Sequence, residues 1–253
     1  MNIVFLALIL FAYYNLWFLI ATVKSRNDLV DLAWGPAFFI SGWSAYLLSG
    51  HSTTSLLVNL LVTFWGLRLF YHIQKRIRGS KEDHRYGEMK KKWQRVKLNS
   101  YFKVFLFQMF LVLIIGSPVF YISFKRPEFN PLMILGVSIW LFGFVFEAVA
   151  DYQLRKFLRS EKKNGVMKKG LWSISRHPNY FGEVVQWWGI FIVSLLSGAP
   201  LWLVVSPFLI TFLILKVSGV PLLEERLKKR EGYLEYVENT PVFLPFIGKK
   251  GSF

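Results

Sequence analysis

Cysteine is absent from this chain of 253 residues, and charged residues make up only 18% of it. Without cysteine there is no disulfide, no thiolate nucleophile and no cysteine-ligated zinc or iron–sulfur site. Because 54% of the residues are hydrophobic and 18% are aromatic, the composition excludes both a soluble domain and a disordered chain. Any chemistry must therefore come from acidic residues, histidine, tyrosine, arginine or a bound cofactor.

Several motifs of soluble enzymes are also missing from the sequence. There is no Gly-x-Gly-x-x-Gly after a strand, no Walker lysine loop and no Gly-x-Ser-x-Gly nucleophile elbow. The four histidines lack the i, i+4 pairing of a zinc site, so we expect no metal site. A nucleotide would be held between the helices and loops of a membrane bundle rather than on a sheet.

Long apolar runs take the place of these motifs. A helix that crosses the hydrocarbon core of a bilayer needs about 20 mostly apolar residues, and seven segments qualify. They predict an all-α polytopic membrane protein in which a single domain spans residues 1–253, with a hairpin between the last two helices at Ser197–Pro200. The seven segments are 2–23, 33–50, 55–74, 104–124, 131–150, 184–198 and 201–220.

Basic residues are distributed unevenly along the chain. There are 31 Lys and Arg against 15 Asp and Glu, which gives a net charge of +16. If the seven segments cross in alternation, most basic residues fall in 75–103, 151–183 and the chain after 221. The positive-inside rule then predicts that these loops are cytoplasmic and that the N-terminus is outside. We interpret the charge surplus as topology and expect no nucleic-acid partner.

Ionisable side chains recur at helical spacing within or beside two of the predicted spans. One set is Arg68, His72 and Arg76, and the other contains Asp151 and Arg155. Burying such groups in a bilayer costs free energy, so their presence in a span indicates a functional role. They indicate a polar cavity that opens to the cytoplasm and binds an anion, for which phosphate is a common choice. The alternative is side chains that reach water at a helix end, with an intrahelical Asp151–Arg155 pair.

The loop before the sixth segment is unusually dense in side chains that bind ligands. It contains Arg176 for a phosphate or carboxylate, His177 and Asn179 as donors or acceptors, Tyr180 with a flat ring, and the acidic Glu183. This density favours a binding site. The alternative is a helix N-terminus at the membrane interface, with Asn179 as its cap.

The chain after Pro221 predicts an amphipathic helix followed by a stretch punctuated by proline. Tyr233 and Tyr236 are three residues apart there, which would let them close over a cofactor bound to the other loops. The alternative is a surface helix with a solvated charged face.

These motifs are similar to those of a known family. The chain reads Asp-Leu-Ala-Trp-Gly at 31–35, Glu-Asp-His-Arg-Tyr at 82–86 and Arg-His-Pro-Asn-Tyr-Phe-Gly-Glu at 176–183, and it ends in a Glu-Glu-Arg…Gly-Tyr…Tyr pattern. With them it resembles the steroid 5α-reductase-like membrane reductases, and more narrowly a bacterial branch of unknown function. The resemblance covers nearly the whole chain.

The resemblance implies NADPH in a cavity that faces the cytoplasm, in a bacterial inner membrane. It implies hydride transfer to an activated carbon–carbon double bond of a lipid-like substrate that enters from the bilayer, with the loops and the tail closing the cofactor cavity. Preference for NADPH over NADH, the substrate and the oligomeric state stay open. The residues implied to bind the cofactor are Arg68, His72, Arg76, Asp151, Arg155, Arg176, His177, Asn179, Tyr180, Glu183, Glu225, Tyr233 and Tyr236.

Reduction of an enone also needs a donor that stabilises the developing enolate oxygen. Family members that reduce steroids use a Glu on the second span and a Tyr on the third, and this chain departs from both. Asp31 is the nearest acidic candidate, Trp65 stands where the tyrosine aligns, and Tyr86 or Tyr71 is the candidate replacement.

Two other functions compete with this one. Methyltransferases of the isoprenylcysteine carboxyl type use a similar Arg-His-Pro loop and a Glu-Glu tail around S-adenosylmethionine, but resemble only the C-terminal third. A non-enzymatic lipid-binding or accessory subunit would scatter its intramembrane polar residues, whereas here they cluster. The seven predicted spans and the Asn-Tyr-Phe-Gly-Glu ending favour the reductase.

Overall fold

The helices follow the apolar runs of the sequence. A computed structural model describes residues 2–159, 165–248 and 251, and no strand occurs in that part of the chain. The prediction of an all-α protein is therefore confirmed. The helices group into two compact units: the first is Met1–Phe129 with Ser197–Ala199, and the second is Asn130–Leu196 with Pro200–Phe253.

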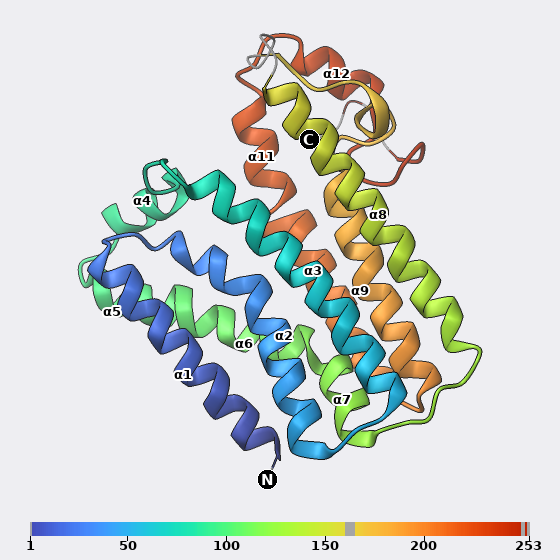
Figure 1. The fold of residues 1–253 in the computed structure, drawn as a ribbon. Coiled ribbons are helices and arrows are strands. Elements are labelled where there is room, and N and C mark those ends of the chain that lie inside the picture. Colours follow the sequence, from blue (N-terminus) through green and yellow to red (C-terminus); the bar gives the residue numbers. More distant parts are fainter. Residues whose placement is uncertain (1, 160–164, 249–250, 252–253) are drawn as a thin grey trace. The chain divides into compact units, whose positions relative to one another are not determined.

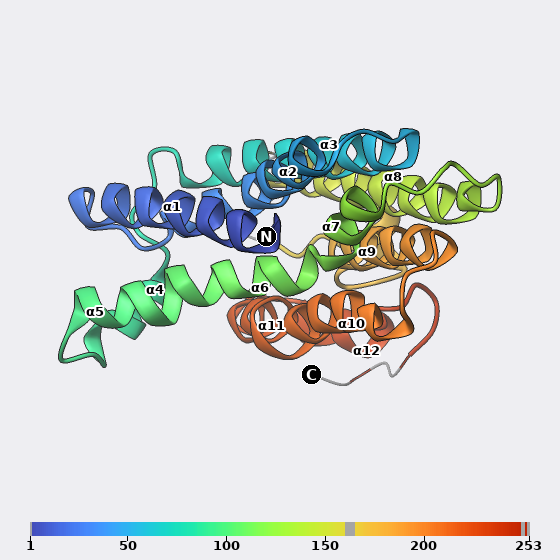
Figure 2. The ribbon, with the colours of Figure 1, turned by 90° about the horizontal axis from the view of Figure 1, so that it is seen from below.

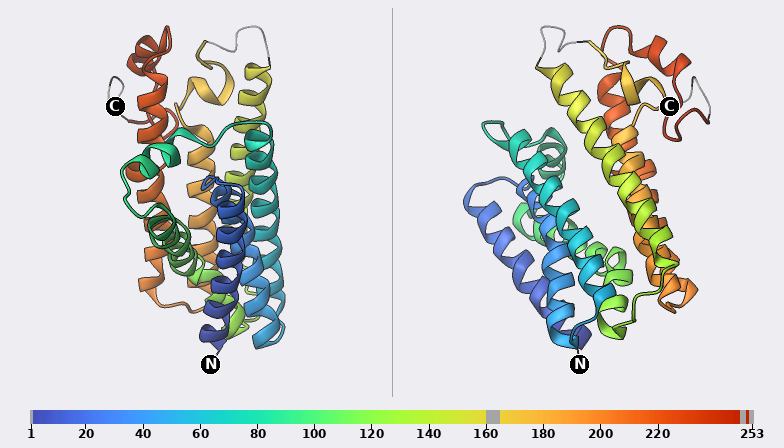
Figure 3. Two further views of the ribbon diagram at one scale, coloured as in Figure 1. Left: turned by 90° about the vertical axis from the view of Figure 1, so that its left-hand side faces the viewer. Right: turned by 45° about the vertical axis from the view of Figure 1, so that its right-hand side comes forward.

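The first unit packs its helices around α2. Figures 1 and 3 show α1, α2 and α3 side by side, and α2 also packs on α7. A glycine pair allows the close approach of α2 and α3, because a Cβ on Gly35 would lie 2.7 Å from the carbonyl oxygen of Gly66. The helices are α1 Asn2–Val23, α2 Leu29–Ser49, α3 Thr53–Ile77, α4 His84–Lys91, α5 Val96–Ser100, the π-helical η1 Tyr101–Leu106, α6 Phe107–Ile115 and α7 Ser117–Lys125.

The second unit is built on the pair α8 and α9, which Figure 2 shows next to α10. A seam of glycines joins α8 to α9. A Cβ on Gly143 would lie 2.6 Å from the carbonyl oxygen of Gly182, and a Cβ on Gly136 would lie 2.8 Å from that of Gly189. The elements are α8 Met133–Leu158, η2 Gly170–Ser173, α9 Pro178–Leu196, η3 Leu201–Val204, α10 Val205–Phe212, η4 Leu213–Val217, α11 Val220–Leu227 and α12 Tyr233–Asn239.

Five helical stretches in the described part of the chain are long and apolar enough to cross a membrane, so this is an integral membrane protein. Neither α2, which contains Asp31 and Pro36, nor α9, which opens with Asn179 and Glu183, is among them. Seven spans and their orientation therefore stay predictions. The five stretches are Ile3–Val23, Thr53–Ile77, Val96–Ile115, Met133–Leu158 and Leu201–Leu227.

Some helices begin or end away from the predicted bounds. The segment predicted at 104–124 starts at Val96 and is interrupted at Gly116, before α7 begins with a proline in its first turn. The segment predicted at 184–198 starts at Pro178, because proline without an N–H fits the first helical position. The Arg176–Glu183 motif thus runs into a helix.

The α8–α9 seam predicts a specific sensitivity to added volume. Gly136→Ala places its Cβ 2.8 Å from the backbone oxygen of Gly189, so the helices must separate, and overpacking of this kind costs about 1–3 kcal/mol. We expect a lower melting temperature of the purified protein in detergent. The matched control is Gly87→Ala in α4, where a Cβ meets no heavy atom within 4 Å. Equal melting temperatures of the two variants would contradict the seam.

Candidate functional site

The Arg176–Glu183 motif opens with a buried ion-pair cluster. Arg176 is 1% exposed and its Nε lies 3.4 Å from Oε1 of Glu224 in α11. His177, also 1% exposed, places Nε2 2.7 Å from the same oxygen. Breaking a buried pair leaves a charge without compensation, so these three side chains fix one another. We call them the Arg176–Glu224–His177 cluster.

The protonation of His177 follows from its surroundings. Burial lowers the pKa of His177, although Glu224 opposes the shift. The imidazole is therefore neutral at physiological pH, and its Nε2–H donates to Glu224 while the carboxylate keeps its charge for Arg176. The ring of Tyr180, one turn along α9, stacks on His177 with centroids 5.7 Å apart and planes at 14°.

The chain after α12 is bound to the segment just ahead of the motif. The backbone N–H of Arg176 donates to the carbonyl of Pro241 at 2.9 Å, and the hydroxyl of Ser175 donates to the carbonyl of Phe243 at 2.7 Å. One step further out, the N–H of Phe246 donates to the carbonyl of Ile174 at 3.0 Å. These bonds form a strap, residues 241–246, that holds the start of the motif.

The two tail tyrosines are part of the same support. Tyr233 and Tyr236 are 1% and 4% exposed and form a small core with Val237. The hydroxyl of Tyr236 donates to the carbonyl of Trp172, ahead of the motif. Both pack within the tail, and the prediction that they close over a cofactor stays a prediction.

A row of acid and amide side chains follows the α8–α9 interface. The Nδ2 of Asn179 donates to Oδ1 of Asp151 at 3.3 Å, and the Nε2 of Gln186 donates to Oε2 of Glu147 at 2.7 Å. Glu183 lies between Asn179 and Gln186 on α9 and is 9% exposed. The two amides are two turns apart on α9 and their acid partners one turn apart on α8, with Glu183 one turn after Asn179.

Asn179 has one side-chain atom to offer to a ligand. Its Nδ2 faces the carboxylate of Asp151, which can only accept, so the amide orientation is determined by that contact. Its Oδ1 is buried, and no hydrogen-bond partner for it occurs among the residues that the structure describes. A buried acceptor of this kind fits an amide donor such as the carboxamide of a nicotinamide ring.

A second polar cluster lies in the first unit, at the start of α2. Asp31 accepts from the hydroxyl of Tyr86 at 2.6 Å, from Nη2 of Arg85 at 3.1 Å and from Nη2 of Arg76 at 3.4 Å. Burial raises the pKa of Asp31, with Arg85 and Tyr86 opposing the shift. Burial also raises the pKa of Tyr86. The motifs at 31–35 and 82–86 thus meet through their polar side chains.

The remaining predicted residues have different surroundings. Tyr71 is 51% exposed, with Nζ of Lys75 4.2 Å from the centroid of its ring. Arg68 and His72 are half-buried one turn apart on α3, and Arg155 is half-buried one turn after Asp151 on α8.

The surroundings of two more of the residues predicted to bind the cofactor differ from those expected, and their roles stay predictions. Glu225 was predicted to contact the cofactor, but it is exposed on α11, and its neighbour Glu224 is the buried residue that binds the motif. Arg176 was predicted to hold a phosphate, but its guanidinium is buried against Glu224. Helical spacing identifies Glu224, since it shares a face with the apolar Val220 and Leu227.

Comparison with known proteins gives partial matches. The chain is 25% identical over 218 residues to "Uncharacterized protein C594.04c" of Schizosaccharomyces pombe, a match of 74% of this chain and 62% of that protein. It is 34% identical over 67 residues to 3-oxo-5-alpha-steroid 4-dehydrogenase 1 of Mus musculus, 26% of each chain. It is 26% identical over 120 residues to the Rattus norvegicus protein of the same name, 47% of this chain and 43% of that protein.

The chain thus matches less than two thirds of the length of each of these relatives. No solved structure matches it. Residues 17–240 match a family described as "Protein of unknown function (DUF1295)", which confirms the resemblance predicted from the motifs. With nearly all of its length inside that match, the chain belongs to the DUF1295 family.

Proposed function

We propose that the protein is an NADPH-dependent membrane reductase that saturates an activated carbon–carbon double bond of a lipid-like substrate drawn from the bilayer. The main support for this proposal is the side chain of Asn179. Asp151 orients its amide, and its buried oxygen is available to an amide donor. Similarity to two proteins named 3-oxo-5-alpha-steroid 4-dehydrogenase 1 supports the reaction class.

We assign cofactor binding to the α8–α9 row. Asn179 accepts from the carboxamide of the nicotinamide, and Asp151 prevents the amide from turning. Glu183, one turn along α9, lies on the same face and adds a second acceptor. When bound, NADPH supplies the hydride that is added to the double bond. Arg68, His72, Arg76 and Arg155 stay candidates for the ribose and phosphate groups.

The Arg176–Glu224–His177 cluster has a supporting role in this proposal. It joins the start of the motif to α11, and the 241–246 strap holds the same segment from the tail. Asn179 follows two residues later, in the first turn of α9. The Asn179 amide must be held precisely, because misplacement of the bound nicotinamide by about 1 Å would lower the rate of hydride transfer strongly.

We assign to Tyr86 the donation of the proton that stabilises the enolate oxygen. Asp31 faces two guanidinium groups and accepts from Tyr86, so it acts as a carboxylate that positions the tyrosine. The Tyr86 hydroxyl turns from Asp31 and gives its proton to the oxygen conjugated with the double bond as the far carbon is reduced. The enol that results would then tautomerise, taking a proton from water at the carbon next to the carbonyl and returning one from oxygen. The guanidinium carbon of Arg85 lies 5.4 Å from the centroid of the Tyr86 ring and offsets the negative charge that develops on the phenol oxygen.

Cofactor binding can be tested without knowledge of the substrate. We expect NADPH at about 100 times its dissociation constant to stabilise the protein by about 2.7 kcal/mol, with no comparable effect of S-adenosylmethionine. Asn179→Ala should abolish the NADPH shift in melting temperature and keep the melting temperature of the free protein. Asn239→Ala is the matched control, because Asn239 is exposed and its Nδ2 donates to the carbonyl of Glu235 within α12.

Two outcomes of that experiment contradict the proposal. Stabilisation by S-adenosylmethionine alone would assign the motif to a methyltransferase. A full NADPH shift in Asn179→Ala would remove Asn179 from the cofactor site.

Proton donation predicts a second phenotype. With an enone that the wild type reduces, found by NADPH consumption across a panel of lipid enones, Tyr86→Phe should lower kcat by about 10²–10⁴-fold, the usual contribution of a general acid. Its NADPH-dependent thermal shift should be unchanged. The control is Tyr71→Phe, because Tyr71 is half exposed on α3. Equal kcat in wild type and Tyr86→Phe would move the acid elsewhere.

The pH dependence of the same reaction has a predictable sign. Tyrosine ordinarily ionises near pH 10, and burial raises the pKa of Tyr86 further. The hydroxyl therefore keeps its proton as the pH rises from about 7 to about 9, and kcat should show no fall from loss of the general acid in that range. A fall in rate that disappears at saturating NADPH and enone would be a binding effect, whereas a fall in kcat itself between these pH values would contradict Tyr86 as the acid.

A further inference from the structure

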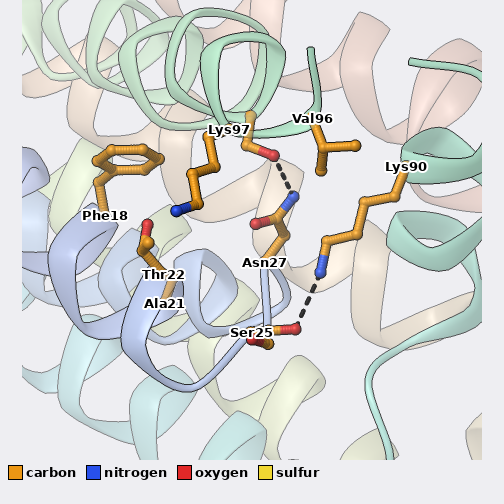
Figure 4. Close-up of a pocket in the computed structure, with 9 residues that line it drawn as sticks. Phe18, Ala21, Thr22, Ser25, Asn27, Lys90, Val96 and Lys97 are labelled. Atoms are coloured by element: carbon orange, nitrogen blue, oxygen red, sulfur yellow. Dashed lines mark hydrogen bonds between the residues drawn. The ribbon is translucent and has the colours of Figure 1, made fainter. Parts of the chain in front are cut away.

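A pocket in the first unit lies outside the residues assigned to the reaction. It is about 240 Å³ in volume, which exceeds the roughly 30 Å³ taken by a water molecule in the liquid several times over. Figure 4 shows its lining, which comes from the end of α1, the loop after it, α4 and α5. One wall is apolar, with Phe18, Ala21 and Val96, and the remainder is polar.

The polar part of the pocket contains two lysines in different states. Nζ of Lys90 lies 2.7 Å and 2.9 Å from the two carboxylate oxygens of Glu82 and donates to the carbonyl of Ser25 at 2.9 Å, so its charge is compensated. Lys97 points into the pocket between Thr22 and Asn27 (Figure 4). Lys97 is exposed, and no hydrogen bond or ion pair to its Nζ occurs in the described part of the chain.

The rest of the polar lining is rigid. The amide of Asn27 is buried and donates from Nδ2 to the hydroxyl of Ser100 at 2.7 Å, and the Asn27 backbone N–H donates to Glu82 at 2.5 Å. Because Glu82 is neutralised by Lys90, the pocket keeps one uncompensated positive charge, that of Lys97. A lysine ammonium beside hydroxyl and amide groups is suited to a phosphate.

The pocket also lies where two candidate spans end. Ile3–Val23 ends one residue after Thr22, and Val96–Ile115 begins one residue before Lys97. The two stretches pack together, since the ring of Phe18 lies 4.9 Å from Tyr101 and 5.3 Å from Phe105 by centroid. The boundary between hydrocarbon and water falls at the ends of such spans, which is the level of phospholipid phosphates.

Apolar side chains are exposed on the same two stretches. Leu19 and Val23 near the end of α1 are 60% and 77% exposed, and Leu98 and Phe102 at the start of the other stretch are 48% and 55% exposed. Exposed apolar surface at this level is available to acyl chains. The positive charge of Lys97, the hydroxyl groups of the pocket and the exposed apolar side chains thus lie at the same end of the two stretches.

We propose that this pocket binds a phosphate group at the membrane boundary, supplied by an anionic phospholipid, with Lys97 as the charge that recognises it. The phosphate occupies the space between Lys97 and Thr22, and the acyl chains lie on the exposed apolar residues of α1, α5 and η1. The site is independent of the proposed reductase chemistry, because none of its lining residues belongs to the cofactor or proton-donor sets.

The test uses the full-length protein, purified in detergent and freed of lipid. Binding of phosphatidylglycerol and of zwitterionic phosphatidylcholine is measured by native mass spectrometry for the wild type and for Lys97→Gln, Lys97→Arg and Lys92→Gln. Lys92 is the matched control, because it lies exposed five residues before Lys97 and does not line the pocket. Its replacement by Gln removes the same charge. Melting temperatures check that every variant is folded.

We expect one phosphatidylglycerol to bind more tightly than phosphatidylcholine, and Lys97→Gln to weaken it about fivefold, the usual effect of one lysine near an anionic surface. Lys97→Arg and Lys92→Gln should bind like the wild type. Equal weakening by Lys97→Gln and Lys92→Gln, or equal binding of the two lipids, would overturn the pocket as a phosphate site. Displacement of the lipid by equimolar inorganic phosphate would assign the site to a soluble phosphate and overturn the lipid as its source.

Discussion

A buried carboxylate, Glu224, is the constraint on which the second unit depends. It accepts from His177 and faces Arg176, so the first residues of the motif are bound to α11 by charge rather than by packing alone. A buried arginine without a partner is strongly destabilising. The ion pairs therefore fix the position of the start of the motif, and the first turn of α9, which follows directly, is positioned with it.

The glycine seam and this cluster act on the same helix from two directions. Gly182 allows the backbone of α9 to approach α8 at the level of Glu147, which brings the amide side chains of α9 against the acids of α8. The cluster and the strap hold the N-terminal end of α9. The polar row at the interface is consequently narrow and well defined, which suits recognition of a planar group.

The sequence predicted the helical class, most of the helical segments and the motif residues because apolar runs and short motifs are local signals. It did not distinguish Glu224 from Glu225, since both are acidic and only the packing of α11 decides which one is buried. The contact of Arg176 with Glu224 could not be predicted for a related reason: arginine is typical of phosphate sites, and its ion pair depends on a residue far along the chain. The contact of Asp31 with Tyr86 is likewise non-local, although both residues were candidates.

The strap and the cluster also have a consequence for biosynthesis. Arg176 and the N–H group beside it obtain their partners, Glu224 and Pro241, only from the last part of the chain to be made. Until that part is made, Arg176 lacks the carboxylate of Glu224, and its backbone N–H lacks the carbonyl of Pro241. A chain that stops before Glu224 therefore keeps the contacts of Asn179 and Gln186 with α8 but lacks both the cluster and the strap that hold the start of the motif.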